Sequence, residues 1–184
     1  MGMIWIKMLI LNNELMNSSL SIRLAELDDI NAIGFLAQQI WPEAYGHILP
    51  QEQLAYMLGL FYSPASLRRQ MLEDKHSFLM VEDDEEPIGF ASWSPLADPG
   101  VYKLHKLYVL PGNQGKGMGK TILNFIFEDI KGARALQLNV NRRNKALQFY
   151  EKMGFSIIRE EDIDIGNNWW MNDYVMEIRL PSTP

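Results

Sequence analysis

A glycine-rich segment near the middle of the chain has the residue types of a phosphate-binding turn. It covers residues 109–121, reads VLPGNQGKGMGKT, and lies between an expected strand and an expected helix. Free backbone N–H groups at a helix start, together with the helix dipole, favour a phosphate. Gly115, Gly117 and Gly119 let the backbone approach a ligand closely and take positive φ angles. We therefore interpret the segment as an anion-binding turn rather than as a connection whose glycines serve only for turning.

Three phosphate-binding motifs compete for this segment. The dinucleotide motif G-x-G-x-x-G fails because it needs a glycine where the chain has Lys120. The P-loop motif G-x-x-x-x-G-K-[ST] has Gln114 in place of its first glycine, and it usually follows the first strand of a fold. A nucleotide-binding P-loop protein therefore stays as an alternative. The third motif, Q/R-x-x-G-x-G/A, is matched in full by Gln114, Gly117 and Gly119.

A second motif follows about thirty residues later, after an expected helix and strand. Residues 141–155 read NRRNKALQFYEKMGF, with two spaced asparagines, a Phe-Tyr pair and a final Gly-Phe. With both motifs in this order, the chain resembles the GCN5-related N-acetyltransferase (GNAT) superfamily over roughly residues 21–180. That family uses the first turn to hold the pyrophosphate of acetyl-coenzyme A, which is the cofactor that the resemblance implies.

The resemblance also implies how the cofactor is held. A strand splayed from its neighbour would offer the backbone of residues 107–109 to the pantetheine arm, and N–H groups of residues 114–120 would bind the pyrophosphate. Asn144 would contact the cofactor or only cap the later helix. Lys145 and Lys152 would lie near the terminal phosphate or simply face solvent. The cofactor residues expected in this way are Leu107, Tyr108, Val109, Gln114, Gly115, Lys116, Gly117, Met118, Gly119, Lys120, Asn141, Asn144, Tyr150 and Lys152.

Tyr150 is the expected catalytic acid, because the family's acid occupies this place in the Phe-Tyr pair and a phenol can give a proton to a departing thiolate. The base is left open. Many members use a glutamate on the long strand, but residues 101–107 contain no acid. His105 lies two residues before Leu107 in the expected strand, so the two side chains are predicted to point to the same face, towards the cleft. Its pKa is expected near the working pH. A structural role for His105, or water relayed to the backbone or to Glu43, are the alternatives.

Aromatic and acidic side chains at two places predict a cationic amine as the acceptor. One is the loop WPEAYGHILPQEQ, with Trp41, Glu43 and Tyr45, which also looks like the polyamine-acetylating branch of the family. The other is the last hairpin, with Trp170 and the acidic stretch 160–164. The acidic stretch is alternatively a strand edge guarded by charge, and the tryptophan a subunit contact.

The elements expected to position these groups form one mixed α/β domain. The resemblance implies a single-domain GNAT fold, in which a mixed, mostly antiparallel sheet has a splayed central strand pair and helices on both faces. Residues 1–19 are expected to be an N-terminal extension, and residues 20–184 the acetyltransferase domain. Strands are predicted over 20–25, 78–82, 88–93, 101–110, 136–140, 156–165 and 170–180, and helices over 28–41, 51–61, 66–74, 121–130 and 144–153.

Composition excludes several classes of protein. The 184 residues contain no cysteine, so disulfides, thiolate zinc sites and cysteine nucleophiles are excluded. The three histidines have no ligand spacing, and no metal is expected. The net charge of −6 argues against a nucleic-acid partner. No segment has 18 continuous apolar residues, so we expect no membrane partner and a cytoplasmic monomer or homodimer.

The charge is divided along the chain. Residues 103–152 hold ten basic and three acidic residues, a net charge of +7, and the remainder has a net charge of −13. The positive block contains both motifs, so we expect it to hold the cofactor and the negative remainder to meet the amine.

The predicted function is transfer of acetyl from acetyl-coenzyme A to a primary amine by direct attack in a ternary complex. A polyamine or another small cationic amine is favoured over a peptide N-terminus or a lysine side chain. Besides the P-loop protein, a catalytically silent coenzyme A sensor on the same fold is the alternative.

Overall fold

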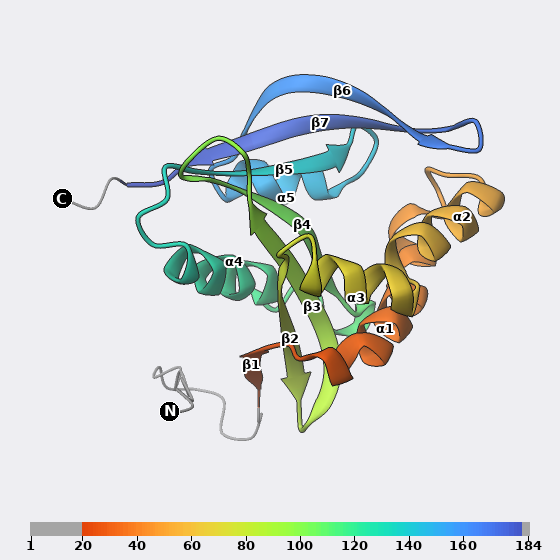
Figure 1. Cartoon of the computed structure of the whole chain (residues 1–184), viewed down its shortest axis with the longest axis horizontal. Coiled ribbons are helices and arrows are strands. Elements are labelled where there is room, and N and C mark those ends of the chain that lie inside the picture. The colour runs from red at the N-terminus through yellow and green to blue at the C-terminus, as the bar shows by residue number, and fades with distance from the viewer. Residues whose placement is uncertain (1–19, 182–184) are drawn as a thin grey trace.

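The computed structural model describes residues 20–181, so the predicted extension over residues 1–19 lies outside it. Figure 1 shows one mixed sheet with helices on both of its faces, as the sequence predicted. The strands are β1 (Ser21–Leu24), β2 (Ser77–Asp83), β3 (Glu86–Pro95), β4 (Val101–Val109), β5 (Ala135–Asn141), β6 (Ser156–Gly166) and β7 (Trp169–Arg179). The helices are α1 (Ile30–Tyr45), α2 (Gln51–Tyr62), α3 (Pro64–Leu72), α4 (Met118–Asp129) and α5 (Ala146–Lys152).

The sheet has the strand order β1-β2-β3-β4-β5-β7-β6. Only β4 and β5 run parallel among the described strands, and every other neighbouring pair is antiparallel. The β4–β5 pairing covers Val101–Leu104 and Ala135–Leu138, and beyond it the two strands separate. The splayed central pair that the resemblance implied is therefore confirmed, and it leaves a gap in the middle of the sheet.

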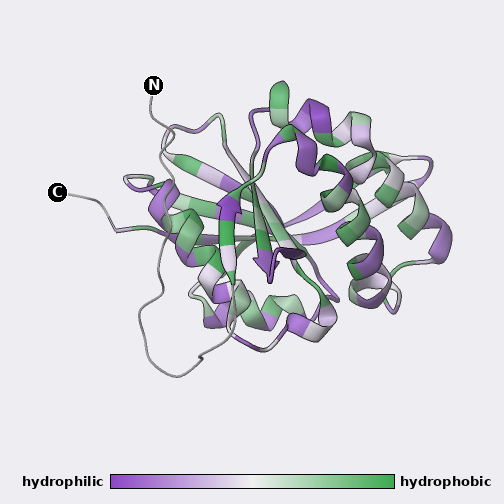
Figure 2. Ribbon diagram, turned by 90° about the horizontal axis from the view of Figure 1, so that it is seen from below, coloured by the Kyte–Doolittle hydropathy of each residue, from purple (hydrophilic) through white to green (hydrophobic). Residues whose placement is uncertain are grey.

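Two hydrophobic cores form because each face of the sheet is covered by amphipathic helices. On one face α4 buries Ile122, Leu123 and Ile126, which are spaced as one helical stripe. On the other face α1 buries Ile33 and Ile40 against residues of β2 and β3. Figure 2 shows the two helical layers, whose ribbons carry both apolar and polar residues. None of the helices within residues 20–181 is long and apolar enough to cross a membrane.

Helix α1 differs from the prediction at both ends. A 3-10 turn over Leu27–Asp29 precedes it, so the helix begins at Ile30 and not after a cap at Asp28. It also continues through Pro42 to Tyr45. Proline removes one backbone donor, and near the C-terminus this costs a single hydrogen bond of the last turns. The aromatic and acidic residues that we expected in a loop therefore lie on a helix.

Candidate active site

A cavity of about 750 Å³ opens where β4 and β5 separate. It is bounded by the end of β4, the glycine-rich turn, the start of α4 and one side of α5. Most of the expected cofactor residues line it, namely Leu107, Tyr108, Val109, Gln114, Gly115, Gly117, Met118, Gly119, Lys120, Asn144 and Tyr150. The two motifs, about thirty residues apart in the chain, thus face a single cavity.

Three residues of the expected cofactor set do not line this cavity. Lys116 is exposed in the turn, and Lys152 is exposed on α5. Asn141 lines a second cavity, and its side-chain oxygen accepts a hydrogen bond from the backbone N–H of Arg143 at 3.0 Å. Lys145, the N-cap residue of α5, does line the first cavity and supplies positive charge there.

The glycine-rich turn has the geometry of a phosphate cradle. Gly115 and Gly117 have φ angles of +77° and +79°, and Gly117 directly precedes α4. The first N–H groups of a helix have no partner within it, so those of α4 are available to an anion at this end. Gln114 ties the turn to the strand, since its Nε2 donates to the Val109 carbonyl at 2.9 Å. The residues present therefore fit a pyrophosphate.

Gly119 lies where α4 meets α5. A Cβ at this position would stand 2.8 Å from Cζ of Phe149, which is too close for a carbon contact. The glycine therefore allows α4 to approach the Phe-Tyr pair and narrows the cavity at this point.

Tyr150 lies on α5 and lines the first cavity. Only 9% of the residue is exposed, and its ring packs edge-on against Phe149 and Phe155, with ring centroids 5.1 and 5.7 Å away. Burial, and to a smaller extent the charge of Tyr45, raises the pKa of the Tyr150 phenol above its ordinary value. The hydroxyl therefore stays protonated at neutral pH, which is the state that a proton donor requires.

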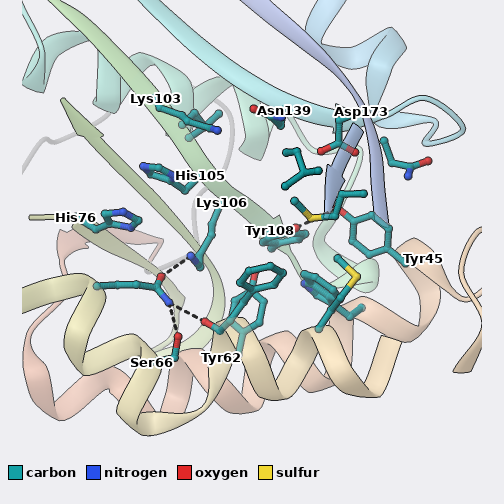
Figure 3. Close-up of a pocket in the computed structure, with 18 of the residues that line it drawn as sticks. Tyr45, Tyr62, Ser66, His76, Lys103, His105, Lys106, Tyr108, Asn139 and Asp173 are labelled. Atoms are coloured by element: carbon teal, nitrogen blue, oxygen red, sulfur yellow. Dashed lines mark hydrogen bonds between the residues drawn. The ribbon is translucent and has the colours of Figure 1, made fainter. Parts of the chain in front are cut away.

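A second cavity of about 320 Å³ lies on the sheet face that α1, α2 and α3 cover (Figure 3). Trp41, Tyr45 and Trp170 line it, as expected for an acceptor pocket, but Glu43 is exposed and lines the first cavity instead. Both cavities share one set of lining residues at the gap, namely Tyr45, Leu104, His105, Lys106, Tyr108 and Asn139. A molecule in the second cavity can therefore meet a ligand in the first.

The β6–β7 hairpin is tied to α2 at the edge of the acceptor pocket. Gln53 Nε2 donates to the backbone carbonyl of Trp170 at 2.8 Å, and the Tyr56 hydroxyl donates to that of Ile165 at 2.7 Å. These two contacts join segments more than a hundred residues apart. They give the pocket a wall that local sequence patterns do not reveal.

None of the acids in the hairpin stretch 160–164 lines the pocket, although Ile163 does and Glu161 accepts a hydrogen bond from Asn139 Nδ2 at 3.0 Å. Arg142 forms ion pairs with Glu160 at 3.4 Å and with Asp162 at 2.8 Å, and both acids are largely exposed. Two lysines of the positive block, Lys103 and Lys106, line the acceptor pocket instead. The expected division, with positive charge for the cofactor and negative charge for the amine, is therefore wrong in detail. An extra residue in β4 between Leu104 and Lys106 interrupts the alternation of the strand and brings both lysines to the acceptor side.

His105 does not share the face of Leu107, and the predicted alternation is wrong here. A β-bulge in β4 pairs Ser92 with Lys106 and the next residue, Trp93, with Leu104, so His105 is an extra residue. Leu107 packs on the core beside α4, whereas His105 lies on the acceptor side of the sheet.

The surroundings of His105 do not suit a base. Its Nε2 is hydrogen-bonded to the Ser94 hydroxyl at 2.8 Å, and its ring stacks on His76 with centroids 3.9 Å apart. Burial, followed by the charges of His76 and Lys106, lowers the pKa of His105 to about 2. An imidazole with this pKa is a poor proton acceptor, so the structure speaks against the role that we expected for it.

Asp173 on β7 is a functional candidate that the sequence analysis missed. Its residue is only 6% exposed, and its carboxylate points into the acceptor pocket beside Asn139 (Figure 3). Burial raises the pKa of Asp173 to about 6, opposed by a hydrogen bond from Asn139 and the charge of Lys103. Its place in the alternation of β7, with the face of Met171 and Val175, is a signal that was available, since an acid on an apolar face is unusual.

Comparison with known proteins agrees with this geometry. Residues 74–157 match the family model described as an acetyltransferase (GNAT) domain. The [ribosomal protein bS18]-alanine N-acetyltransferase of Haemophilus influenzae is 30% identical over 121 residues, which cover 65% of this chain and 76% of the relative. The spermidine N(1)-acetyltransferase of Thermoplasma acidophilum is 28% identical over 172 residues, 89% of this chain and 99% of the relative.

Solved structures give the same result. The crystal structure of PaiA N-acetyltransferase from Thermoplasma acidophilum in complex with coenzyme A superimposes with a TM-score of 0.75 and 27% identity, covering 88% of this chain and 99% of that one. Two motifs facing one cavity, a splayed strand pair and these relatives lead to one conclusion. The chain belongs to the GNAT family of N-acetyltransferases, the enzymes that use acetyl-coenzyme A as their acetyl donor.

Proposed function

We propose that this protein acetylates a primary amine of a small acceptor molecule, which enters through the pocket beside α1–α3. One observation carries the proposal. The two cavities meet at the gap between β4 and β5, with Tyr150 lining the first and Asp173 lining the second. A proton donor and a proton acceptor thus stand on the two sides of the place where a thioester and an amine would meet.

Asp173 is the proposed proton acceptor. An amine with an ordinary pKa near 10.4 arrives as an ammonium ion and must lose a proton before its nitrogen can attack. A carboxylate in the pocket attracts the ammonium ion and can take that proton, directly or through one water molecule. This role replaces the one expected for His105, and it also differs from the alternative of water relayed to Glu43, which lies at the other cavity.

Tyr150 is the proposed proton donor. Bound acetyl-coenzyme A supplies a thioester carbonyl whose carbon an amine can attack, with departure of the sulfur as a thiolate. Tyr150 lines the cavity for this donor, and in this proposal its hydroxyl gives its proton to the departing sulfur. In the balance, the ammonium nitrogen loses one proton to Asp173 before it attacks and a second one as the C–S bond breaks. The nitrogen gains the acetyl group, the sulfur gains the Tyr150 proton, and Tyr150 regains a proton from the second one released by the nitrogen, through solvent.

A polyamine is the acceptor that the sequence predicted, and it stays a candidate because of one observation. One relative that matches over almost its whole length is named a spermidine N(1)-acetyltransferase. The aromatic residues Trp41, Tyr45 and Trp170 in the pocket are compatible with a cationic chain through contacts with their ring faces.

The two alternatives to an acetyltransferase have less support. In the P-loop reading, the Thr121 hydroxyl would bind magnesium, whereas here it donates to the Gly117 carbonyl at 3.4 Å. A silent coenzyme A sensor would have no need of an acid and a base in facing cavities.

A thiol-release assay with acetyl-coenzyme A tests the proposal. The acceptors are polyamines, peptide N-termini, lysine peptides, amino acids and aminoglycosides, each followed for release of free coenzyme A. We expect release with at least one small amine, and formation of its acetyl derivative. Tight cofactor binding without release for any amine would support the sensor instead. Magnesium-dependent ATP binding that Lys120→Ala abolishes would support the P-loop protein.

A further inference from the structure

Lys106 is a buried cation without an anionic partner. The residue is 7% exposed, and its Nζ donates to Gln70 Oε1 at 2.6 Å. In the part of the chain that the structure describes, no carboxylate forms an ion pair with it, and burial lowers its pKa to about 7. The Tyr62 and Phe78 rings lie 5.4 and 5.5 Å from Nζ and give only partial compensation. A buried cation without a counter-ion is costly to keep in a fold unless a ligand supplies one.

The position of Lys106 points to such a ligand. Figure 3 shows its side chain within the acceptor pocket, where a chain of hydrogen bonds holds it. Gln70, which accepts from Nζ, itself donates to the Ser66 hydroxyl at 3.0 Å and to the Phe61 carbonyl at 2.9 Å. The amide is therefore locked with its oxygen towards the lysine, and the two other ammonium protons are free to meet an anion.

A buried acid, Asp173, lies elsewhere in the same pocket. Lys106 comes from β4 and reaches towards α3, whereas Asp173 comes from β7 on the far side of β5. Both residues line the acceptor pocket, and Lys106 also lies at its junction with the first cavity. Lys103 and the Arg69–Asp74 ion pair at 3.4 Å also line the pocket, but Lys106 and Asp173 are its two buried charged residues. The pocket thus has a buried acid for an ammonium group and a buried cation for a second, negatively charged group of the same molecule.

We propose that the acceptor is an amino-carboxylate, whose carboxylate pairs with Lys106 while its amine lies next to Asp173 and the acetyl donor. This inference rests on the proposed function and narrows its acceptor. A diamine or polyamine would bring a second ammonium group to a buried ammonium group, which like-charge repulsion disfavours.

Matched pairs of acceptors test the inference. Thiol release is measured for α-amino acids and for ω-amino acids of increasing chain length, each beside the diamine and the ω-amino amide of the same length. We expect kcat/KM for the best amino acid to exceed that of its diamine and its amide by about 100-fold, since each buried charged hydrogen bond contributes a factor of this order. Lys106→Met is expected to reduce this preference to about threefold or less, through loss of activity on the amino acid.

The controls separate this inference from the proposed function. Lys131→Met removes an exposed lysine that lines neither cavity and should leave the preference unchanged. Calorimetry of the best amino acid on the coenzyme A-saturated protein gives a second readout, in which Lys106→Met should weaken binding about 10-fold or more. Equal or better use of diamines, or a preference that survives Lys106→Met, would overturn the inference while leaving the acetyltransferase intact. Absence of thiol release with every amine would instead overturn the proposed function, and the inference with it.

Discussion

The two cavities that meet at the gap between β4 and β5 are built in different ways. The cofactor cavity is shaped mainly by backbone, with Gly115 and Gly117 at positive φ angles and the first N–H groups of α4 directed to one end. The acceptor pocket is lined by side chains that come from three helices and four strands, such as Trp41, Gln70 and Asp173.

This difference has a physical reason. A turn that presents backbone groups needs particular residues at short spacing, because φ angles and helix starts are local properties. A pocket of converging side chains depends on where the sheet and helices bring distant residues, and many combinations of residues give the same enclosure. The cofactor cavity can therefore be shared by enzymes that act on different amines, while the acceptor pocket decides which amine reacts.

The largest effect is expected from the acid in the acceptor pocket. Asp173→Asn keeps the shape of the side chain but removes the proton acceptor, and we expect kcat to fall about 1000-fold. Because the pKa of Asp173 lies at about 6, the carboxylate form is lost as the pH falls through 6, so wild-type activity should rise with pH across that value. Steady-state kinetics from pH 5 to 8 check this, and the variant should lack that rise. Unchanged turnover would exclude Asp173 as the base.

Tyr150→Phe should have a smaller effect, which belongs to the cofactor side. It removes only the proton donor to the departing thiolate, and we expect kcat to fall about 100-fold while the Kd for coenzyme A stays within about threefold. Calorimetry with coenzyme A and rapid-mix kinetics separate the two quantities. A large loss of cofactor affinity with little change in turnover would mean that the phenol only packs against its neighbours.

The backbone character of the cofactor cavity is tested with two glycines of the same turn. Gly119→Ala pushes a carbon against Phe149, where the available distance is 2.8 Å, and we expect KM for acetyl-coenzyme A to rise about 10-fold. Gly112→Ala is the matched control, since a Cβ there meets nothing within 4 Å. Equal effects of the two changes would contradict the close approach of α4 to α5.

The smallest expected effect is the contribution of Lys106, in the acceptor pocket, to the pH dependence of the free energy of unfolding. The pKa of Lys106 is lowered to about 7 in the fold and is near 10.4 in an unfolded chain, so between these values the unfolded state binds more protons. The free energy of unfolding should therefore rise with pH over this range because of this group, by about 2 kcal/mol from pH 7 to pH 9. Urea denaturation of wild type and Lys106→Met at both pH values measures the difference. A parallel pH dependence in both proteins would place the Lys106 ammonium in contact with water.

The sequence predicted the order and type of every strand and of the five helices within the described residues, because each carries a clear apolar period or a turn signal. It also predicted the glycine-rich turn between β4 and α4, most of whose residues line the first cavity. The course of α1 through Pro42 was missed, since a proline normally ends a helix pattern, and here tertiary packing of Trp41 keeps the last turn helical.

The predictions from sequence failed for side chains whose position depends on pairing between strands that are distant in the chain. The position of His105 was misjudged because a bulge leaves no mark in the alternation of a single strand. Asp173 was overlooked although it shares the face of Met171 and Val175. Its meeting with Lys106 could not be predicted, because only the sheet brings β4 and β7 to one pocket.

The bulge at His105 has a consequence for the acceptor pocket. Residues from Lys106 onwards keep their register with β3, and those before the bulge are displaced by one position. Loss of a single residue at this point would exchange the side chains that the first half of β4 presents to the acceptor, and leave the strand end beside the cofactor untouched. A change in the number of residues at this position is therefore expected to alter the acceptor pocket of this protein as strongly as a substitution in it.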